Sequence, residues 1–270
     1  MERHVILTLG RSGSNTLCDM LNQNPAVLNF GEVLGEWNAV RKLQRRLPLI
    51  PQGDEAFLDW VLYSGAFLRM VNAVRSLRKT LAGQRGAAKP IRDIQSWGIK
   101  DFSLNFTRFG LSDYLDNRAD LKVIGLLRQD VVDRMISNAM LGATGVIKTT
   151  SARSGGRKTL RIEPTQVAAL LADIETENTE LEAMLGRLPE ARKLVIRYED
   201  LFSDPELRHQ TMAAIFAFLG VEPVRTEERM VKIIRRPVKE VIENFDECVA
   251  AVRGTPHEEL LQRAAARGAT

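Results

Sequence analysis

The chain has 270 residues, of which 38 are Lys or Arg and 34 are Asp or Glu, so its formal net charge is +4. Hydrophobic residues make up 44% and charged residues 27%, which is typical of a folded protein and excludes a disordered tail, a collagen-like repeat and a coiled coil. The charge is too small to indicate a nucleic-acid partner, although it favours capture of a small polyanion at a local basic site.

Three features bear on where the chain works. No apolar segment reaches the roughly 18–20 residues of a membrane span. The first four residues lead straight into a short apolar strand, without the apolar region or cleavage site of a signal peptide. Two cysteines, Cys18 and Cys248, are too few for a disulfide framework. We therefore expect a cytoplasmic protein without an integral membrane segment.

The first third of the chain begins with a strand. Residues 5–9 are short, apolar and β-branched, and Gly10 stops them. A helix is predicted over 16–22, a second strand over 27–30, and a mainly helical region over 37–83.

The rest of the chain alternates between strands and helices. Strands are predicted over 97–100, 121–127 and 194–198, and the second of these is apolar enough to be central in a parallel sheet. The other predicted segments are helices over 130–142, 164–186 and 205–220, and a polar Gly/Ser-rich loop over 142–161.

This alternation predicts an α/β fold with a P-loop-like parallel sheet and helices on both faces. We expect a single domain over residues 1–270, with a helical insertion at about 38–95 after the second strand. Ligands of such sheets bind beyond the carboxyl ends of the strands, so the residues just after each strand are the candidate site.

The loop after the first strand reads Gly10-Arg11-Ser12-Gly13-Ser14-Asn15-Thr16. Small residues between a strand and a helix let backbone N–H groups converge on an anion, and Arg11 adds a full positive charge. Ser12, Ser14 and Thr16 add hydroxyl donors. The lysine of the nucleotide-triphosphatase signature is absent. A phosphate cradle is favoured over the alternative, a tight turn with a capping serine.

A second basic segment follows the central strand. Arg128 ends that strand, and Ser137 lies nine positions later, on the same helix face as Arg134. An arginine and a serine so placed can hold a second phosphate, while the alternative is a surface salt bridge of Arg128 with Asp130 and Asp133. Two separate anion sites suit a nucleotide that is phosphorylated at both its 3′ and 5′ ends.

At this point the sequence resembles a known family. The first loop is similar to the 5′-phosphosulfate loop of sulfotransferases that use 3′-phosphoadenosine-5′-phosphosulfate (PAPS), and residues 127–137 are similar to their 3′-phosphate motif. The Arg-to-Ser spacing is closest to the bacterial carbohydrate-sulfating branch. Further similar segments are Gly142-Ala143-Thr144-Gly145-Val146, Tyr198-Glu199-Asp200-Leu201, Asp204-Pro205, Phe218-Leu219-Gly220 and residues 242–247. This chain departs from the family at Gly10, where proline is usual, and in lacking an Arg-Lys-Gly tripeptide.

The resemblance implies transfer of a sulfuryl group from PAPS as co-substrate, with no metal. It implies that Arg11 faces the 5′-phosphate and the moving sulfuryl group, that Arg128 and Ser137 hold the 3′-phosphate, and that Tyr198 contacts the adenine. The residues implied around the 5′-phosphate are Ser12, Gly13, Ser14, Asn15 and Thr16, through backbone N–H groups and the Ser14 and Thr16 hydroxyls.

A sugar hydroxyl needs a general base, and the carbohydrate branch uses a glutamate after the second strand. Glu32 fits that position, with Glu36 next and Asp101 third; the alternative for Glu32 is a solvated loop carboxylate. The histidines His4, His209 and His257 do not follow a strand at the ligand edge, and we expect them at the surface.

Two other patterns leave alternatives open. The late cations Lys232, Arg235, Arg236 and Lys239 are spaced as one helical face, which favours a solvated face over a 3′-phosphate clamp. The apolar positions from Phe57 to Leu81 favour a packed core helix over an acceptor groove or a lipid contact.

The favoured function is therefore sulfuryl transfer to an acceptor hydroxyl, on a glycan or glycolipid by resemblance to the branch. The competing classes are a P-loop kinase of a small metabolite and a catalytically inactive nucleotide-binding module. The sequence is compatible with a homo-oligomer.

Overall fold

The computed structural model describes residues 1–81, 89–144, 159–230 and 237–267. Within them, one parallel sheet has the strand order β2-β3-β1-β4-β5. The strands are β1 (Glu2–Thr8), β2 (Val27–Asn29), β3 (Ser96–Phe102), β4 (Leu121–Leu127) and β5 (Lys193–Arg197). Thr8 of β1 pairs with Phe102 of β3 and with Leu126 of β4, so these three strands end level with one another. The predicted α/β fold with a parallel sheet is confirmed.

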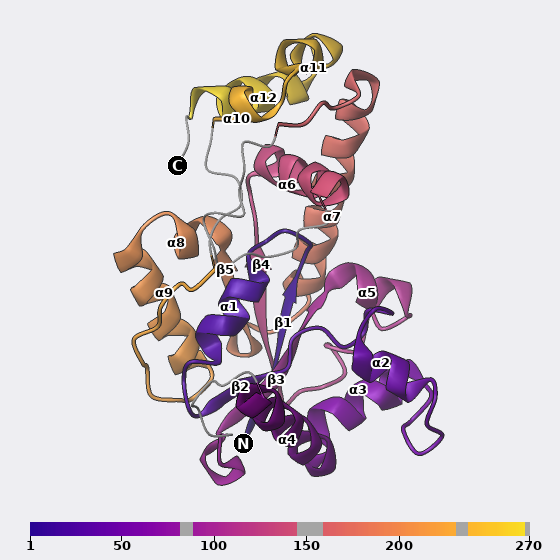
Figure 1. Cartoon of the computed structure of the whole chain (residues 1–270), viewed down its shortest axis with the longest axis vertical. Helices are drawn as coiled ribbons and strands as arrows, with labels where there is room; N and C mark the ends of the chain where they lie inside the picture. Colours follow the sequence, from indigo (N-terminus) through magenta and orange to yellow (C-terminus); the bar gives the residue numbers. More distant parts are fainter. Residues whose placement is uncertain (82–88, 145–158, 231–236, 268–270) are drawn as a thin grey trace.

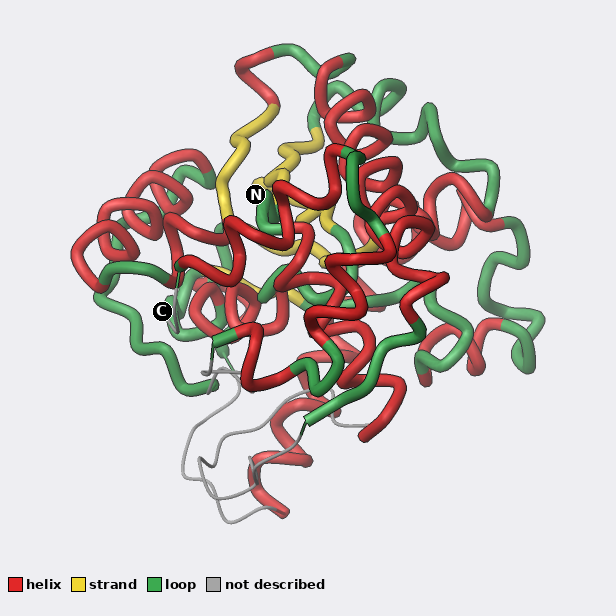
Figure 2. The backbone as a smooth tube through the Cα atoms, turned by 90° about the horizontal axis from the view of Figure 1, so that it is seen from above, coloured by secondary structure: helices red, strands yellow, loops and turns green. Residues whose placement is uncertain are grey.

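Alternation along the strands directs side chains to two different cores. Ile6 packs on the face covered by α1 (Ser14–Leu21), α8 (Tyr198–Phe202) and α9 (Pro205–Phe218). Val5 and Leu7 pack on the opposite face. That face is covered by α3 (Asp54–Tyr63), α4 (Gly65–Leu81), α5 (Ser103–Arg108) and the second half of α7 (Val167–Gly186). Figure 2 shows the strands at the centre with helices around them.

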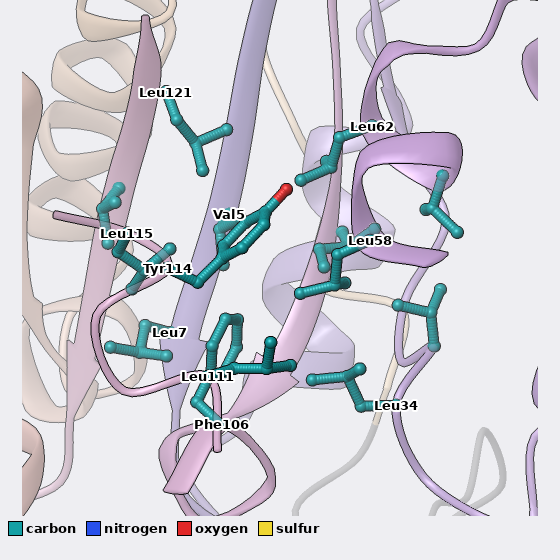
Figure 3. Close-up of a cluster of buried hydrophobic side chains, with 14 of the residues drawn as sticks. Val5, Leu7, Leu34, Leu58, Leu62, Phe106, Leu111, Tyr114, Leu115 and Leu121 are labelled. Carbon is teal, nitrogen blue, oxygen red and sulfur yellow. The ribbon is translucent and has the colours of Figure 1, made fainter. Parts of the chain in front are cut away.

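The second of these cores packs between the sheet and the helices α3, α4, α5 and α7. Figure 3 shows the Tyr114 ring lying between Leu115, Leu121 and Val5 on one side and Leu58 and Leu62 of α3 on the other. The Tyr114 hydroxyl donates to Asp59 Oδ1 at 2.8 Å, which satisfies its one polar group.

A third core lies beyond the carboxyl edge of the sheet. It joins α6 (Val131–Thr144) and the first half of α7 to the late helices, which lie together at the top of Figure 1. These are α10 (Val238–Val241), α11 (Phe245–Ala251) and α12 (Pro256–Ala266). An isolated parallel bridge between Leu160 and Ile242 links the two parts of this layer. The layer fixes α6, which carries Arg134 and Ser137.

The remaining elements are short. They are α2 (Ala39–Gln44) and three 3₁₀ turns, η1 (Ile91–Asp93), η3 (Pro164–Gln166) and η4 (Glu190–Arg192). None of the helices in the described ranges is both long enough and apolar enough to cross a membrane.

The helical region predicted over 37–83 is interrupted. α2 ends at Gln44 and α3 begins at Asp54, with Pro48 and Pro51 between them. Proline lacks an N–H donor and cannot continue a helix, which explains the break. Phe57 and Phe67 are buried, as the core interpretation requires, whereas Leu77 in α4 is exposed.

Candidate active site

Three segments meet at the carboxyl edge of the sheet. They are the loop between β1 and α1, the start of α6 after β4, and α8 after β5 (Figure 1). Because β1, β4 and β5 are neighbours in a parallel sheet, their following segments lie side by side. The predicted residues Arg11, Arg128 and Tyr198 come together in this way.

The backbone of the first loop has an unusual conformation. Arg11 has φ 63° and Gly13 has φ 75°, and in the described part of the chain Arg11 is the one non-glycine residue with positive φ. A left-handed non-glycine residue costs of order 1–3 kcal/mol and persists where its surroundings hold it. A Cβ at Gly13 would lie 2.6 Å from the Phe202 ring, so glycine is required for space as well as for φ.

Two buried arginines hold this loop, Arg134 from α6 and Arg128 from the segment between β4 and α6. Arg128 Nη1 donates to the carbonyl of Arg11 at 2.8 Å, and Arg134 Nε donates to the carbonyl of Gly10 at 3.0 Å. In a trans peptide the N–H points opposite to the C=O. The N–H groups of Arg11 and Ser12 are therefore turned away from the two arginines, as a backbone anion site requires.

The side chain of Arg11 joins the loop to α6. Its Nε donates to Ser137 Oγ at 2.9 Å. Burial lowers the pKa of Arg11, and the nearby positive charge of Arg128 lowers it further. Asp133 accepts from Arg128 at 3.0 Å, and Glu177 forms an ion pair with Arg134. An anion between Arg11 and Arg128 would relieve their mutual repulsion.

One predicted hydroxyl does not face an anion site. Ser12 Oγ donates to the Leu9 carbonyl at 2.8 Å and is hydrogen-bonded to Thr8 Oγ1 at 2.6 Å, so it fastens the loop to the end of β1. Only the Ser12 backbone remains for a ligand. Ser14 and Thr16 lie in the first turn of α1, whose N-cap, Gly13, makes no side-chain cap. The backbone N–H groups in this first turn of α1 have no acceptors within the helix.

Tyr198 begins α8 rather than ending β5, so the strand ends one residue earlier than predicted. Its ring lies against the Arg128 guanidinium, 4.3 Å from the ring centre, and is also packed beside Phe202. Burial raises the pKa of Tyr198. The Tyr198 ring thus contacts both the Arg128 guanidinium and Gly13 of the first loop.

Glu32 follows β2, and its side chain is half-buried and held by two partners, unlike the fully solvated loop carboxylate of the alternative interpretation. Its Oε1 forms an ion pair with Lys100 Nζ, and its Oε2 accepts from Trp37 Nε1 at 2.9 Å. Lys100 lies in β3, opposite Ile6 of β1, and its side chain is 1% exposed. Lys100 was missed by sequence reasoning; the available signal was a lysine within an otherwise apolar central strand.

The two other candidate carboxylates are engaged differently. Asp101 is fully buried and accepts from Val33 N, Leu34 N and Asn105 Nδ2 at 2.9, 2.8 and 2.6 Å. It therefore anchors the loop after β2. Glu36 is exposed and bonded to Arg45 at 3.0 Å, and this bond and the charge of Arg108 lower the pKa of Glu36.

The histidine prediction was wrong for His4. The ring is fully buried between Ser96 Oγ at 2.9 Å and Asn29 Nδ2 at 3.1 Å, and burial lowers its pKa to about 3. His4 is a core residue because polar neighbours satisfy both ring nitrogens. His257, in α12, is half-buried, and its Nε2 lies 3.1 Å from Glu175 Oε2.

Of the late cations, Lys232, Arg235 and Arg236 lie outside the described residues, as does most of the predicted loop over 142–161. Within the described ranges, no group of three or more His, Cys, Asp or Glu residues is placed to hold a metal ion.

The fold and this cationic edge define an α/β protein with a loop arranged for an anion. A sequence profile of the sulfotransferase family matches residues 5–226, which include the sheet and all three segments of the site. The chain belongs to the sulfotransferase family. Comparison with curated proteins gives no match.

Several solved structures are similar to the chain. A sulfotransferase from Alicyclobacillus acidocaldarius is 16% identical with a TM-score of 0.48, over 99% of this chain and 96% of that chain. The sulfotransferase domain from the curacin biosynthetic pathway is 17% identical with a TM-score of 0.44, over 98% and 96%. The sulfotransferase domain of the Synechococcus PCC 7002 olefin synthase is 18% identical with a TM-score of 0.41, over 98% and 94%.

Proposed function

We propose that this sulfotransferase moves a sulfuryl group from PAPS to a hydroxyl of a glycan or glycoconjugate. The observation that carries the proposal is the charged connection between the loops after β1 and β4. Arg128 bonds the Arg11 carbonyl, and Arg11 bonds Ser137, so both anion-binding segments form one unit. Membership of the sulfotransferase family disfavours the small-metabolite kinase, and the reducing compartment expected from two cysteines supports a cytoplasmic reaction.

In this proposal the 5′-phosphate of the donor lies on the first loop. The inward N–H groups of residues 12–15 and the hydroxyls of Ser14 and Thr16 donate to its oxygens, and the start of α1 adds its dipole. Arg11 neutralises the charge that grows on the leaving phosphate as the S–O bond breaks.

The 3′-phosphate lies between Arg128 and Ser137. Arg128 Nε is a buried donor without an acceptor among the described residues, and a phosphate oxygen would satisfy it. Ser137 accepts from Arg11 and so keeps its own hydroxyl proton for donation to the phosphate. Tyr198, fixed against Arg128, is proposed to contact the adenine as well.

Glu32 is proposed as the general base. As the acceptor oxygen forms its bond to sulfur, its proton passes to a carboxylate oxygen of Glu32. Lys100 is paired with Oε1 of this carboxylate, and Trp37 donates to Oε2. The remaining lone pairs can accept a hydrogen bond from the hydroxyl group of the sulfuryl acceptor. Glu36 lies further from the end of β2, and the oxygens of buried Asp101 are taken up by backbone and Asn105 N–H groups, so we rank both behind Glu32.

The Arg128→Ala variant tests the nucleotide assignment. We expect its affinity for 3′-phosphoadenosine-5′-phosphate (PAP) to fall by about 1.5–3 kcal/mol, the contribution of a charge-assisted contact. Its affinity for AMP, which lacks the 3′-phosphate, should change little. Titration calorimetry of both ligands measures the difference. Equal losses for PAP and AMP would show that Arg128 does not read the 3′-phosphate.

Arg134 is proposed as a positioning residue, because it orients the Gly10 carbonyl without facing the ligand. Arg134→Met should lower the free energy of unfolding by about 3 kcal/mol, since a buried pair with Glu177 is broken. It should also weaken PAP binding about tenfold because the loop carbonyl is released.

The matched control is Arg41→Met. Arg41 is also a buried arginine, 4% exposed and paired with Asp54, but it lies in α2. We expect a similar loss in the free energy of unfolding with unchanged PAP affinity. If both variants bind PAP as the wild type does, Arg134 has only a structural role.

A further inference from the structure

Beside Glu32, the structure exposes an aromatic ring that is nevertheless held in one place. Trp37 is 58% exposed, the largest exposed fraction of any aromatic side chain among the described residues. A single exposed apolar residue is common on protein surfaces, so the exposure of Trp37 marks a site only together with the contacts that hold its ring beside Glu32.

Two contacts hold this ring, and the next residue is held as well. Its Nε1 donates to Glu32 Oε2 at 2.9 Å. Its inner atoms lie so close to Gly35 that a Cβ there would be 2.5 Å from Trp37 Cε2, so the ring rests on a residue without a side chain. The following residue, Asn38, caps α2 by accepting from Val40 N at 2.7 Å and donates to the Glu32 carbonyl.

The loop beneath the ring is equally constrained. Asn38 N donates to the Gly35 carbonyl at 2.9 Å, and buried Asp101 accepts from Val33 N and Leu34 N. The exposed ring therefore loses little conformational freedom when a ligand covers it, which favours binding.

We propose that Trp37 is the acceptor platform of the enzyme and that its ring stacks on the C–H face of a pyranose ring. This inference rests on the proposed function, and it identifies Trp37 as the residue that contacts the sugar acceptor. A pyranose presents a face of axial C–H bonds to the indole, while its hydroxyls project from the rim toward water and polar side chains. Because Nε1 of the same ring is bonded to Glu32, a stacked sugar presents a rim hydroxyl to the proposed base.

The first experiment uses the full chain labelled with 5-fluorotryptophan and ¹⁹F NMR. The chain has 3 tryptophans, and loss of one signal in Trp37→Phe assigns Trp37. The other two, Trp60 and Trp97, pack in the cores and serve as internal controls. The probe is a mixture of cellobiose, maltose, lactose and chitobiose, added to PAP-saturated protein.

We expect the mixture to shift the Trp37 signal and to leave the other two signals in place. No shift of the Trp37 signal, or equal shifts of all three, would overturn the platform. PAP binding is measured on the same sample, so its failure would be recognised separately as a failure of the proposed function.

The second experiment compares Trp37→Leu with Leu77→Ala by saturation-transfer difference NMR on the same sugars. Leu77 is also exposed, at 60%, but lies on α4 rather than in the loop that carries Glu32 and Trp37. Trp37→Leu should weaken sugar binding about tenfold or more while PAP affinity stays unchanged, and Leu77→Ala should change neither.

The conservative variant Trp37→Phe separates stacking from the bond to Glu32. It keeps an aromatic face and removes the N–H donor, so sugar binding should be largely retained. Sugar binding that survives in Trp37→Leu, or that is lost equally in Trp37→Phe and Trp37→Leu, contradicts stacking on this ring.

Discussion

Glu32→Gln should lower sulfuryl transfer by about 10²–10⁴ while PAP affinity stays close to that of the wild type. Glutamine keeps the shape of the side chain and its acceptor for Lys100, but it cannot take a proton from the acceptor hydroxyl. Release of sulfate from PAPS to water provides the rate where an acceptor is lacking.

This substitution also removes the counter-charge of buried Lys100, so a loss of about 2 kcal/mol in the free energy of unfolding is expected. Asp54→Asn is the matched control, because it removes the counter-charge of buried Arg41. Its turnover should stay near that of the wild type. If Glu32→Gln keeps near-native turnover while Glu36→Gln or Asp101→Asn abolishes it, the base is one of those carboxylates.

Arg11→Asn should lower sulfuryl transfer by about 10²–10³, the effect of removing one group that stabilises transition-state charge. Asparagine is chosen because it tolerates the left-handed conformation at φ 63° better than most residues, so the loop keeps its shape. PAP affinity should fall less than the rate, because the charge on the 5′-phosphate grows as the S–O bond breaks. Single-turnover and binding measurements separate the two effects.

Arg11→Lys serves as the comparison for this variant. It keeps a positive charge and loses the planar group that donates to Ser137 at 2.9 Å, so partial activity is expected. Equal decreases in PAP affinity and rate for Arg11→Asn would show that Arg11 binds the ground state only.

The sheet was predictable from the sequence because each strand is a short apolar segment bounded by glycine or polar residues. The strand order β2-β3-β1-β4-β5 was not, since it depends on pairings between residues about 90 positions apart, such as Glu2 with Ser96. Pro48 and Pro51 signal the break between α2 and α3. The helical spacing of apolar residues over 37–83 nevertheless favoured one mainly helical region.

The candidate site was predictable where residue type and position alone suffice. Arg11, Arg128 and Ser137 follow neighbouring strands, and the structure brings them together. Side-chain direction was not predictable: Ser12 Oγ turns toward β1, and Arg134 reaches the Gly10 carbonyl.

Long-range partners on the acceptor side were also beyond the sequence. The ion pair of Glu32 with Lys100 joins residues 68 positions apart. The placement of Trp37 on Glu32 and Gly35 depends on a loop that buried Asp101 holds from below. In the same way, His4 is buried because β2 and β3 bring Asn29 and Ser96 to its two nitrogens.

Thermal unfolding with PAP, and separately with ATP and Mg²⁺, tests the central claim most directly, because the claim is one bound nucleotide with phosphates at both ends. PAP without Mg²⁺ at about 100 times its dissociation constant should add roughly 2.7 kcal/mol of stability. That corresponds to a rise of about 5–10 °C in Tm for a chain of this size. AMP should give a smaller rise at the same concentration. A rise with ATP and Mg²⁺ and none with PAP would contradict the account.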